Sequence, residues 1–186
     1  MTLVLASRSP QRRAILEQLG VAFVERPADV AEEETGDPEE VALANARRKA
    51  LAVGAREDEV VLGVDTIVAL DGEIWGKPPD APAARTTLRR LSGRTHLVIS
   101  GLALLFAGGD VQSASATTEV TFRTLDETLM DWYVASEEWA GRAGGYAIQG
   151  RGAALVERIN GDYLNVVGLP LATLIQLWPR VLELST

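Results

Sequence analysis

The chain is best understood from Val60-Val-Leu-Gly-Val-Asp65-Thr-Ile-Val68, an apolar and largely β-branched run with one carboxylate inside it. This composition predicts a buried strand. An isolated buried charge is too costly to keep, so Asp65 is expected to be paired, hydrogen-bonded or bound to metal. From these residues alone, a carboxylate that ends a strand and caps a turn is as good an interpretation as a catalytic one.

Helices and strands alternate on both sides of this run, with long antiparallel pairs in the middle. This order predicts a mixed α/β fold rather than a doubly wound one. A length of 186 residues suits one domain, residues 1–186, built as two lobes that share a sheet. Residues 29–37 are expected to form a loop. Helices are predicted over residues 10–19, 38–55, 80–91, 126–138 and 169–184, and strands over residues 3–6, 21–24, 60–64, 67–70, 73–75, 95–106, 111–123 and 154–158.

The composition limits the classes of partner. A net charge of −8 argues against general affinity for nucleic acid polymers or membranes, and no apolar run approaches the ~20 residues that span a bilayer. The absence of cysteine excludes disulfides and thiolate sites, and residues 1–6 do not resemble a signal peptide, so a cytoplasmic location is expected. Residues 29–40 hold seven acids and no base, beside small basic clusters elsewhere. This pattern fits a polyanionic small molecule held with a divalent cation, and equally ordinary solvated helix faces.

Two hydroxyls and several arginines surround the start of the first predicted helix, in Ser7-Arg-Ser9-Pro-Gln11-Arg12-Arg13. Free N–H groups at a helix N-terminus attract phosphate, and arginine adds fork-shaped donors. By itself, however, such a pattern more often indicates a capped helix with a solvated basic first turn.

A glycine-rich stretch over residues 141–152 matches neither the dinucleotide fingerprint nor the P-loop. It is either a pair of turns or a loop that approaches a ligand, with the Gln149 amide offered to a base edge. His96 is the only histidine and has no neighbouring histidine or cysteine, so neither a zinc site nor a Ser-His-Asp triad is expected.

Taken together, these motifs resemble the Maf family of septum-formation proteins, which are nucleoside triphosphate pyrophosphatases, and they occur along the chain in the family's order. The matching segments span nearly the whole chain: residues 5–10 with Arg12, Glu32, residues 46–50, residues 63–68, residues 76–78, residues 144–150 and residues 159–170.

The resemblance implies an elongated sheet flanked by helices, related to the inosine triphosphate pyrophosphatases, with a cleft between two lobes. It also implies hydrolysis between the α- and β-phosphates and a homodimer. Asp65 would accept the proton of the attacking water and hold Mg²⁺ or Mn²⁺ with Glu32, although the adjacent Glu33 and Glu34 leave the choice of glutamate open. The residues expected to bind substrate are Ser7, Ser9, Gln11, Arg12, Lys49, Thr66, Lys77 and Gln149, with Lys49 and Lys77 acting in catalysis.

Within the family, Thr66 and Gln149 match the subgroup that acts on dTTP and UTP. Gln11 matches neither that subgroup, which usually has arginine there, nor the 7-methylguanosine triphosphate subgroup, which has tryptophan. A 7-methylguanosine triphosphate pyrophosphatase remains the alternative enzyme. A non-catalytic regulator of division, acting through a protein partner, remains the alternative of another class.

Overall fold

The computed structural model describes residues 1–184, in which seven strands form one mixed sheet. The strands are β1 (Thr2–Leu5), β2 (Phe23–Glu25), β3 (Glu59–Leu70), β4 (Glu73–Trp75), β5 (Thr95–Phe106), β6 (Val111–Phe122) and β7 (Val156–Asn160). Their order is β2-β1-β3-β5-β6-β7, with β4 also beside β3. The β1 strand pairs in parallel with β2 and β3, and all other pairs are antiparallel. The predicted mixed α/β class is confirmed.

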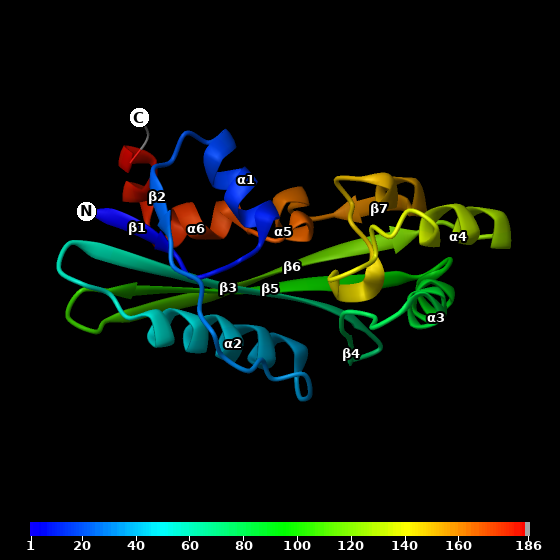
Figure 1. The fold of residues 1–186 in the computed structure, drawn as a ribbon, viewed down its shortest axis with the longest axis horizontal. Coiled ribbons are helices and arrows are strands. Elements are labelled where there is room, and N and C mark those ends of the chain that lie inside the picture. Colours follow the sequence, from blue (N-terminus) through cyan, green and yellow to red (C-terminus); the bar gives the residue numbers. More distant parts are fainter. Residues whose placement is uncertain (185–186) are drawn as a thin grey trace.

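Helices cover both faces of the sheet, which is elongated because β3, β5 and β6 are long (Figure 1). The α-helices are α1 (Pro10–Gln18), α2 (Pro38–Val53), α3 (Ala81–Leu91), α4 (Glu127–Val134), α5 (Tyr163–Val167) and α6 (Leu171–Leu177). Three short 3₁₀ segments are η1 (Ala143–Gly145), η2 (Arg151–Leu155) and η3 (Pro179–Leu184). Among residues 1–184, no helix has the length and apolar character needed to cross a bilayer.

Alternation along the strands divides the core between the two faces, since successive side chains of a strand point to opposite sides. Leu5 and Leu62 belong to the cluster that contains α1 and α6, whereas Val4 and Val61 pack with Ala46 of α2. A further cluster joins the far ends of β5 and β6 to α3, α4 and η2. The three long strands therefore connect apolar clusters at both ends of the sheet.

The predicted strands 60–64 and 67–70 are in fact the single strand β3, and that prediction was wrong. Antiparallel pairing with β5 continues from Val60 to Ala69, so the backbone does not turn at Asp65. Thr66 and Ile67 are β-branched and fit a pleated strand, which explains why the run is continuous. Asp65 therefore lies inside a strand and caps no turn.

The predicted helix over residues 169–184 was also wrong, because this region is divided into α6 and η3. Trp178 is extended, with φ −144° and ψ 80°, as expected for the residue before a proline. The sequence analysis also missed the short helix α5, which Asp162 caps by accepting from the Leu164 N–H at 2.8 Å.

Four other predicted elements are displaced by two or more residues at one end at least. The predicted helix 126–138 ends at Val134 in α4, and Glu137 has φ +60°, which a helix does not allow. The strand predicted over 154–158 begins only after η2, as β7, and the one predicted over 21–24 is β2. The second helix ends at Val53 rather than residue 55, because Gly54 has φ +68°.

His96, on β5, lies in the cluster between the sheet and α4 and is only 1% exposed. Its Nε2 lies 2.9 Å from the Tyr146 hydroxyl, and the rings of Phe122 and Tyr146 pack against it edge-on. Burial lowers the pKa of His96 to about 4 and raises the pKa of Tyr146. His96 is therefore a neutral core residue at neutral pH.

This burial predicts a specific acid sensitivity. The unfolded chain gains a proton at His96 as the pH falls below about 6.5, whereas the folded chain gains it only near its lowered pKa of about 4. The free energy of unfolding should therefore fall between these pH values, by up to about 3 kcal/mol from this residue. Urea unfolding at stepped pH should show that His96→Gln removes this part of the slope, and an unchanged slope would contradict the assignment.

Candidate active site

The site lies where one edge of β3 is left unpaired. β1 pairs with β3 up to Leu62, and β4 pairs with it only from Val68 onward. Between them, residues 63–67 expose the strand edge to a pocket of about 470 Å³. Side chains from both faces of β3 reach this gap, Asp65 from the α2 side and Thr66 from the opposite side. The pocket thus brings together segments from residues 6–12, 28–32, α2, β3, Lys77 and residues 141–149.

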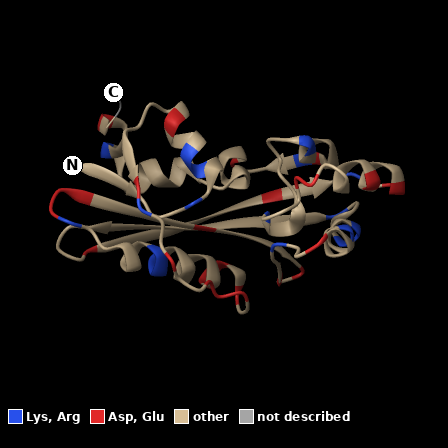
Figure 2. Ribbon diagram, viewed as in Figure 1, with Lys and Arg blue, Asp and Glu red and all other residues tan. Residues whose placement is uncertain are grey.

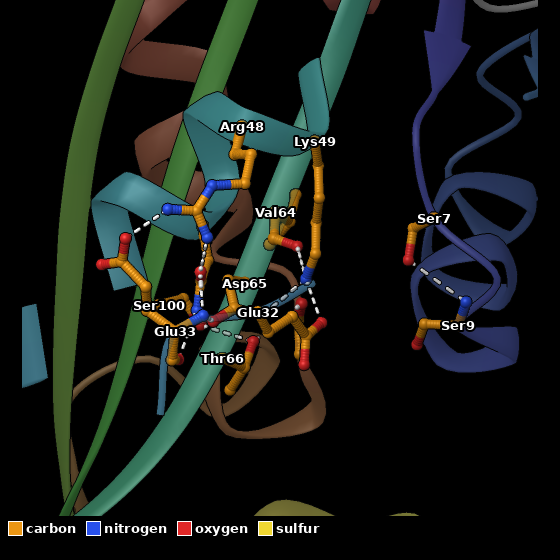
Figure 3. Close-up of polar contacts among 12 residues, drawn as sticks. Ser7, Ser9, Glu32, Glu33, Arg48, Lys49, Val64, Asp65, Thr66 and Ser100 are labelled. Atoms are coloured by element: carbon orange, nitrogen blue, oxygen red, sulfur yellow. Dashed lines mark hydrogen bonds and ion pairs between the residues drawn. The ribbon is translucent and has the colours of Figure 1, made fainter. Parts of the chain in front are cut away.

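Asp65 is 7% exposed and both of its carboxylate oxygens are hydrogen-bonded (Figure 3). Lys49 Nζ donates to Oδ1 at 2.6 Å, and Asn45 Nδ2 donates to Oδ2 at 3.0 Å. Lys49 is itself 8% exposed, so the two charges form a buried pair. The expectation that a carboxylate in this run must be paired is met, because pairing offsets the cost of burying it.

The α2 helix reaches Asp65 because small residues let it approach the sheet closely. Asn45 and Lys49 are four residues apart, so they lie on one face of the helix. Beside them, Ala46 packs so tightly that a Cβ on Gly63 would lie 2.1 Å from its carbonyl oxygen. A Cβ on Gly101, the partner of Asp65 on β5, would lie 2.2 Å from the carbonyl oxygen of Ala42. Glycine at these strand positions is therefore a condition for the site.

Glu32 is the acidic-loop glutamate that faces the pocket. Its Oε1 lies 2.6 Å from Lys49 Nζ, and its Oε2 accepts from Lys77 Nζ at 3.3 Å. Burial alone would raise the pKa of Glu32, but the hydrogen bonds and charges of the two lysines outweigh it and lower that pKa. Glu33 instead pairs with Arg48, and Glu34 is exposed. Several Asp and Glu positions lie close together in the loop before α2 (Figure 2).

Arg12 is the buried cation on the other side of the gap, at 8% exposed. Its guanidinium donates to Gly168 O at 2.9 Å, Ser7 Oγ at 2.9 Å and Thr66 Oγ1 at 3.2 Å. Burial lowers the pKa of Arg12, and the charges of Asp65 and Glu32 oppose this shift. Arginine remains charged in proteins even so, which leaves a fixed positive group at the first turn of α1.

The start of α1 is organised by its hydroxyls, as the sequence predicted for a capped helix. Ser9 is the N-cap and accepts from the Arg12 N–H at 3.5 Å. The Ser9 hydroxyl also donates to Gln11 Oε1 at 3.1 Å, and its N–H donates to Ser7 Oγ at 3.2 Å. All of these residues line the pocket, so the cap and the candidate phosphate site coincide.

The Thr66 hydroxyl is hydrogen-bonded to other protein groups. In addition to Arg12, its Oγ1 lies 2.9 Å from the buried Ser100 hydroxyl and 3.4 Å from Gly168 O. Thr66, which the resemblance links to base selection, is therefore also the residue of β3 that accepts a hydrogen bond from Arg12.

The other end of the pocket is more apolar. Tyr146 lines it together with several valines, among them Val68, Val98 and Val166. The glycine-rich stretch forms two turns that approach this wall: Gly144 has φ +65°, and a Cβ there would lie 2.9 Å from the Val68 methyl groups. Gln149 is exposed, lines the pocket and makes no side-chain hydrogen bond within residues 1–184. The stretch therefore consists of turns that bring Gln149 to the pocket, and contact of Gln149 with a base edge stays a prediction.

Lys77 stands at the pocket mouth, with its side chain 57% exposed. The segment that carries it is tied to the glycine-rich stretch, because Gly144 N–H donates to Gly76 O at 3.1 Å and Gly145 packs on Pro78. Two motifs that are far apart in the chain thus form one wall of the pocket.

Comparison with known proteins identifies this arrangement. The family model for Maf-like protein matches residues 2–181. The chain belongs to the Maf family. The Maf chain is 43% identical to the dTTP/UTP pyrophosphatase of Pyrococcus furiosus, over 94% of this chain and 93% of the relative. It is 49% identical to the enzyme of the same name from Anaeromyxobacter dehalogenans, over 91% and 89%. The resemblance inferred from the motifs is confirmed.

A solved nucleoside triphosphatase, described as a dITP/XTP pyrophosphatase, from Mycobacterium abscessus is also similar to the Maf chain. It shares 22% identity and a TM-score of 0.48, over 67% of this chain and 76% of that one.

The structure brings every predicted site residue of this Maf chain into one pocket, from Ser7 near the N-terminus to Gln149. Among the residues that sequence reasoning missed are Arg142, which lines the pocket, and Asn45 and Ser100, which are hydrogen-bonded to Asp65 and Thr66. Asn45 could have been found from its spacing, because it lies one helical turn before Lys49. Ser100 carried no such signal, since its role depends on the register between β3 and β5.

Proposed function

We propose that this chain hydrolyses the α–β phosphoanhydride of nucleoside triphosphates, releasing a nucleoside monophosphate and pyrophosphate, and that it favours dTTP and UTP. The observation that carries the proposal is the meeting of Asp65, Glu32 and Lys49, with Lys49 Nζ 2.6 Å from both carboxylates, in a pocket that also holds Arg12 and Lys77. The family relationship to enzymes named dTTP/UTP pyrophosphatase supports it.

In this proposal, Asp65 accepts the proton of the attacking water. A general base must be held in a defined orientation within hydrogen-bonding reach of that water, and Lys49 and Asn45 fix the carboxylate from two sides. Departure of pyrophosphate builds negative charge on the phosphate oxygens. Arg12, Lys49 and Lys77 would bind these oxygens, with Ser7 and Ser9 at the helix N-terminus, and so lower the barrier.

The acidic residues fit a divalent cation shared with the substrate. Glu32 and Asp65 meet at one ammonium nitrogen, and Mg²⁺ is usually bound through one or two carboxylates together with substrate phosphates. Within residues 1–184, no group of three His, Cys, Asp or Glu side chains offers a site by itself. When bound, Mg²⁺ or Mn²⁺ would neutralise phosphate oxygens and position water.

A nucleotide panel tests the proposal. The purified chain is incubated with magnesium and UTP, dTTP, CTP, GTP or 7-methylguanosine triphosphate, and pyrophosphate and monophosphate are measured. Pyrophosphate release should be fastest with UTP and dTTP. A preference for 7-methylguanosine triphosphate would support the alternative enzyme. No hydrolysis of any nucleotide would leave the non-catalytic regulator.

Gln149 is the residue expected to read the base. An amide can both donate and accept, which suits a pyrimidine edge that presents a carbonyl and an N–H, whereas a carboxylate only accepts. Gln149→Glu should therefore lower the ratio of kcat/KM for UTP to that for GTP by roughly 5- to 150-fold. Gln112→Glu makes the same chemical change on β6, outside the pocket-lining residues, and should leave the ratio unchanged. An unchanged ratio for Gln149→Glu would exclude base reading at this position.

A further inference from the structure

We propose that Asn45 is a positioning residue that holds the general base Asp65 and the backbone of the Glu32 loop in one fixed arrangement. This inference rests on the function proposed above. It concerns a residue that would touch neither water nor nucleotide and would act through Asp65.

The amide of Asn45 binds Asp65 and the backbone of Glu33, and its Oδ1 also accepts a longer bond from Arg48 Nη1 at 3.4 Å. Its Nδ2 donates to Asp65 Oδ2 at 3.0 Å and to Glu33 O at 2.9 Å, and its Oδ1 accepts from Glu33 N–H at 2.8 Å. The residue is 2% exposed, so water does not replace these bonds. One side chain therefore connects α2 to β3 and to the acidic loop at once.

The contact between Asn45 and Asp65 matters because Lys49, the other partner of Asp65, also binds other groups. Lys49 holds Oδ1, but Lys49 also pairs with Glu32 and is a cation that a triphosphate would attract. The Asn45 amide is neutral and has no acceptor or donor left to exchange. It therefore keeps Oδ2 fixed whether or not Lys49 turns toward phosphate, and a fixed orientation is what a general base requires.

The Asn45 amide also fixes the position of the loop that carries Glu32. The loop over residues 26–36 has no strand or helix of its own, and the paired hydrogen bonds to Glu33 fasten it one residue after Glu32. A pair of bonds to one backbone unit needs a donor and an acceptor on a short stem, which asparagine supplies. Aspartate at this position would keep the acceptor, lose both donors and place a negative charge beside Asp65.

The test compares Asn45→Ala and Asn45→Asp with Thr87→Ala. Thr87 is also a buried helical residue with a side-chain hydrogen bond, 3.1 Å to Ala83 O, but it lies on α3 outside the pocket. We expect kcat for UTP to fall about 10- to 100-fold in Asn45→Ala and further in Asn45→Asp, with KM changed less than about threefold. Thr87→Ala should lower Tm but keep the wild-type kcat.

Repeating the substitution in the Asp65→Asn variant distinguishes a positioning role of Asn45 from a general loss of stability. If Asn45 acts through Asp65, adding Asn45→Ala to Asp65→Asn should lower the residual kcat by a smaller factor than it lowers the wild-type kcat, because groups that act as a unit are not additive and only the contribution through the Glu32 loop is left. A further loss of the same size as in the wild-type background would overturn the inference, as would wild-type kcat in both Asn45 variants. Should Asn45→Ala fail to fold, Asn45→Leu, which is nearly isosteric, makes no hydrogen bond and adds no charge, provides the same comparison. Inactivity of the wild-type chain would instead overturn the proposed function.

Discussion

Replacing Asp65 by asparagine is expected to reduce kcat for UTP at least ~10²-fold while the protein stays folded, since this is the low end of the contribution of a general base. The amide has nearly the same shape but cannot take a proton from water. Lys49 keeps a carboxylate partner in Glu32, 2.6 Å away, so the buried ammonium is not left alone. Pyrophosphate release and thermal unfolding, measured on the same preparation, check both parts of the prediction.

Asp110→Asn is the matched control for this change. Asp110 is exposed in the turn between β5 and β6, outside the pocket lining, and its backbone carbonyl accepts from the Phe106 N–H at 2.9 Å, a bond that the substitution keeps. The Asp110→Asn variant should hydrolyse UTP with the wild-type kcat. Wild-type turnover by a folded Asp65→Asn protein would remove Asp65 from the role of base.

The sequence predicted the strands and helices best where periodicity and local signals agreed. The hairpin of β5 and β6 was placed nearly to its ends, and Pro38 marked the start of α2. It failed where long-range contacts decide. The continuity of β3 through Asp65 depends on its pairing with β5, and the Trp178-Pro179 break was hidden by an apolar pattern that resembles one helix.

The site was predicted as a set of residues, and the structure adds how they reach one another. Ordered motifs identified Asp65, Lys49 and Arg12, but no pattern shows that Thr66 is hydrogen-bonded to Arg12. The role of Asn45 depends on how closely α2 approaches Gly63 and Gly101, which is a property of packing and not of motif spacing. The homodimer, the cytoplasmic location and a link to septum formation stay predictions.

Removal of divalent cations is expected to abolish hydrolysis, and Mg²⁺ or Mn²⁺ to restore it. Glu32 and Asp65 present two carboxylates to the pocket, and the lysines lower the pKa of Glu32, so that it is ionised at neutral pH. Next to a triphosphate, these charges repel the substrate unless a cation lies between them. Chelation followed by dialysis, then titration with each metal during pyrophosphate release, measures the requirement.

The three adjacent glutamates provide the decisive comparison for this metal role. Glu32→Gln should raise the Mg²⁺ concentration for half-maximal activity about 10- to 100-fold or more, since even loss of an indirect partner of a metal site has effects of this size. It should also weaken the rise in Tm that Mn²⁺ causes in the presence of a non-hydrolysable nucleotide. Glu34→Gln should match the wild type in both measurements because Glu34 is exposed and outside the pocket lining, and Glu33→Gln should do so because its carboxylate pairs with Arg48. Full activity of the wild type in chelator, or equal metal dependence of Glu32→Gln and Glu34→Gln, would exclude Glu32 as a metal ligand.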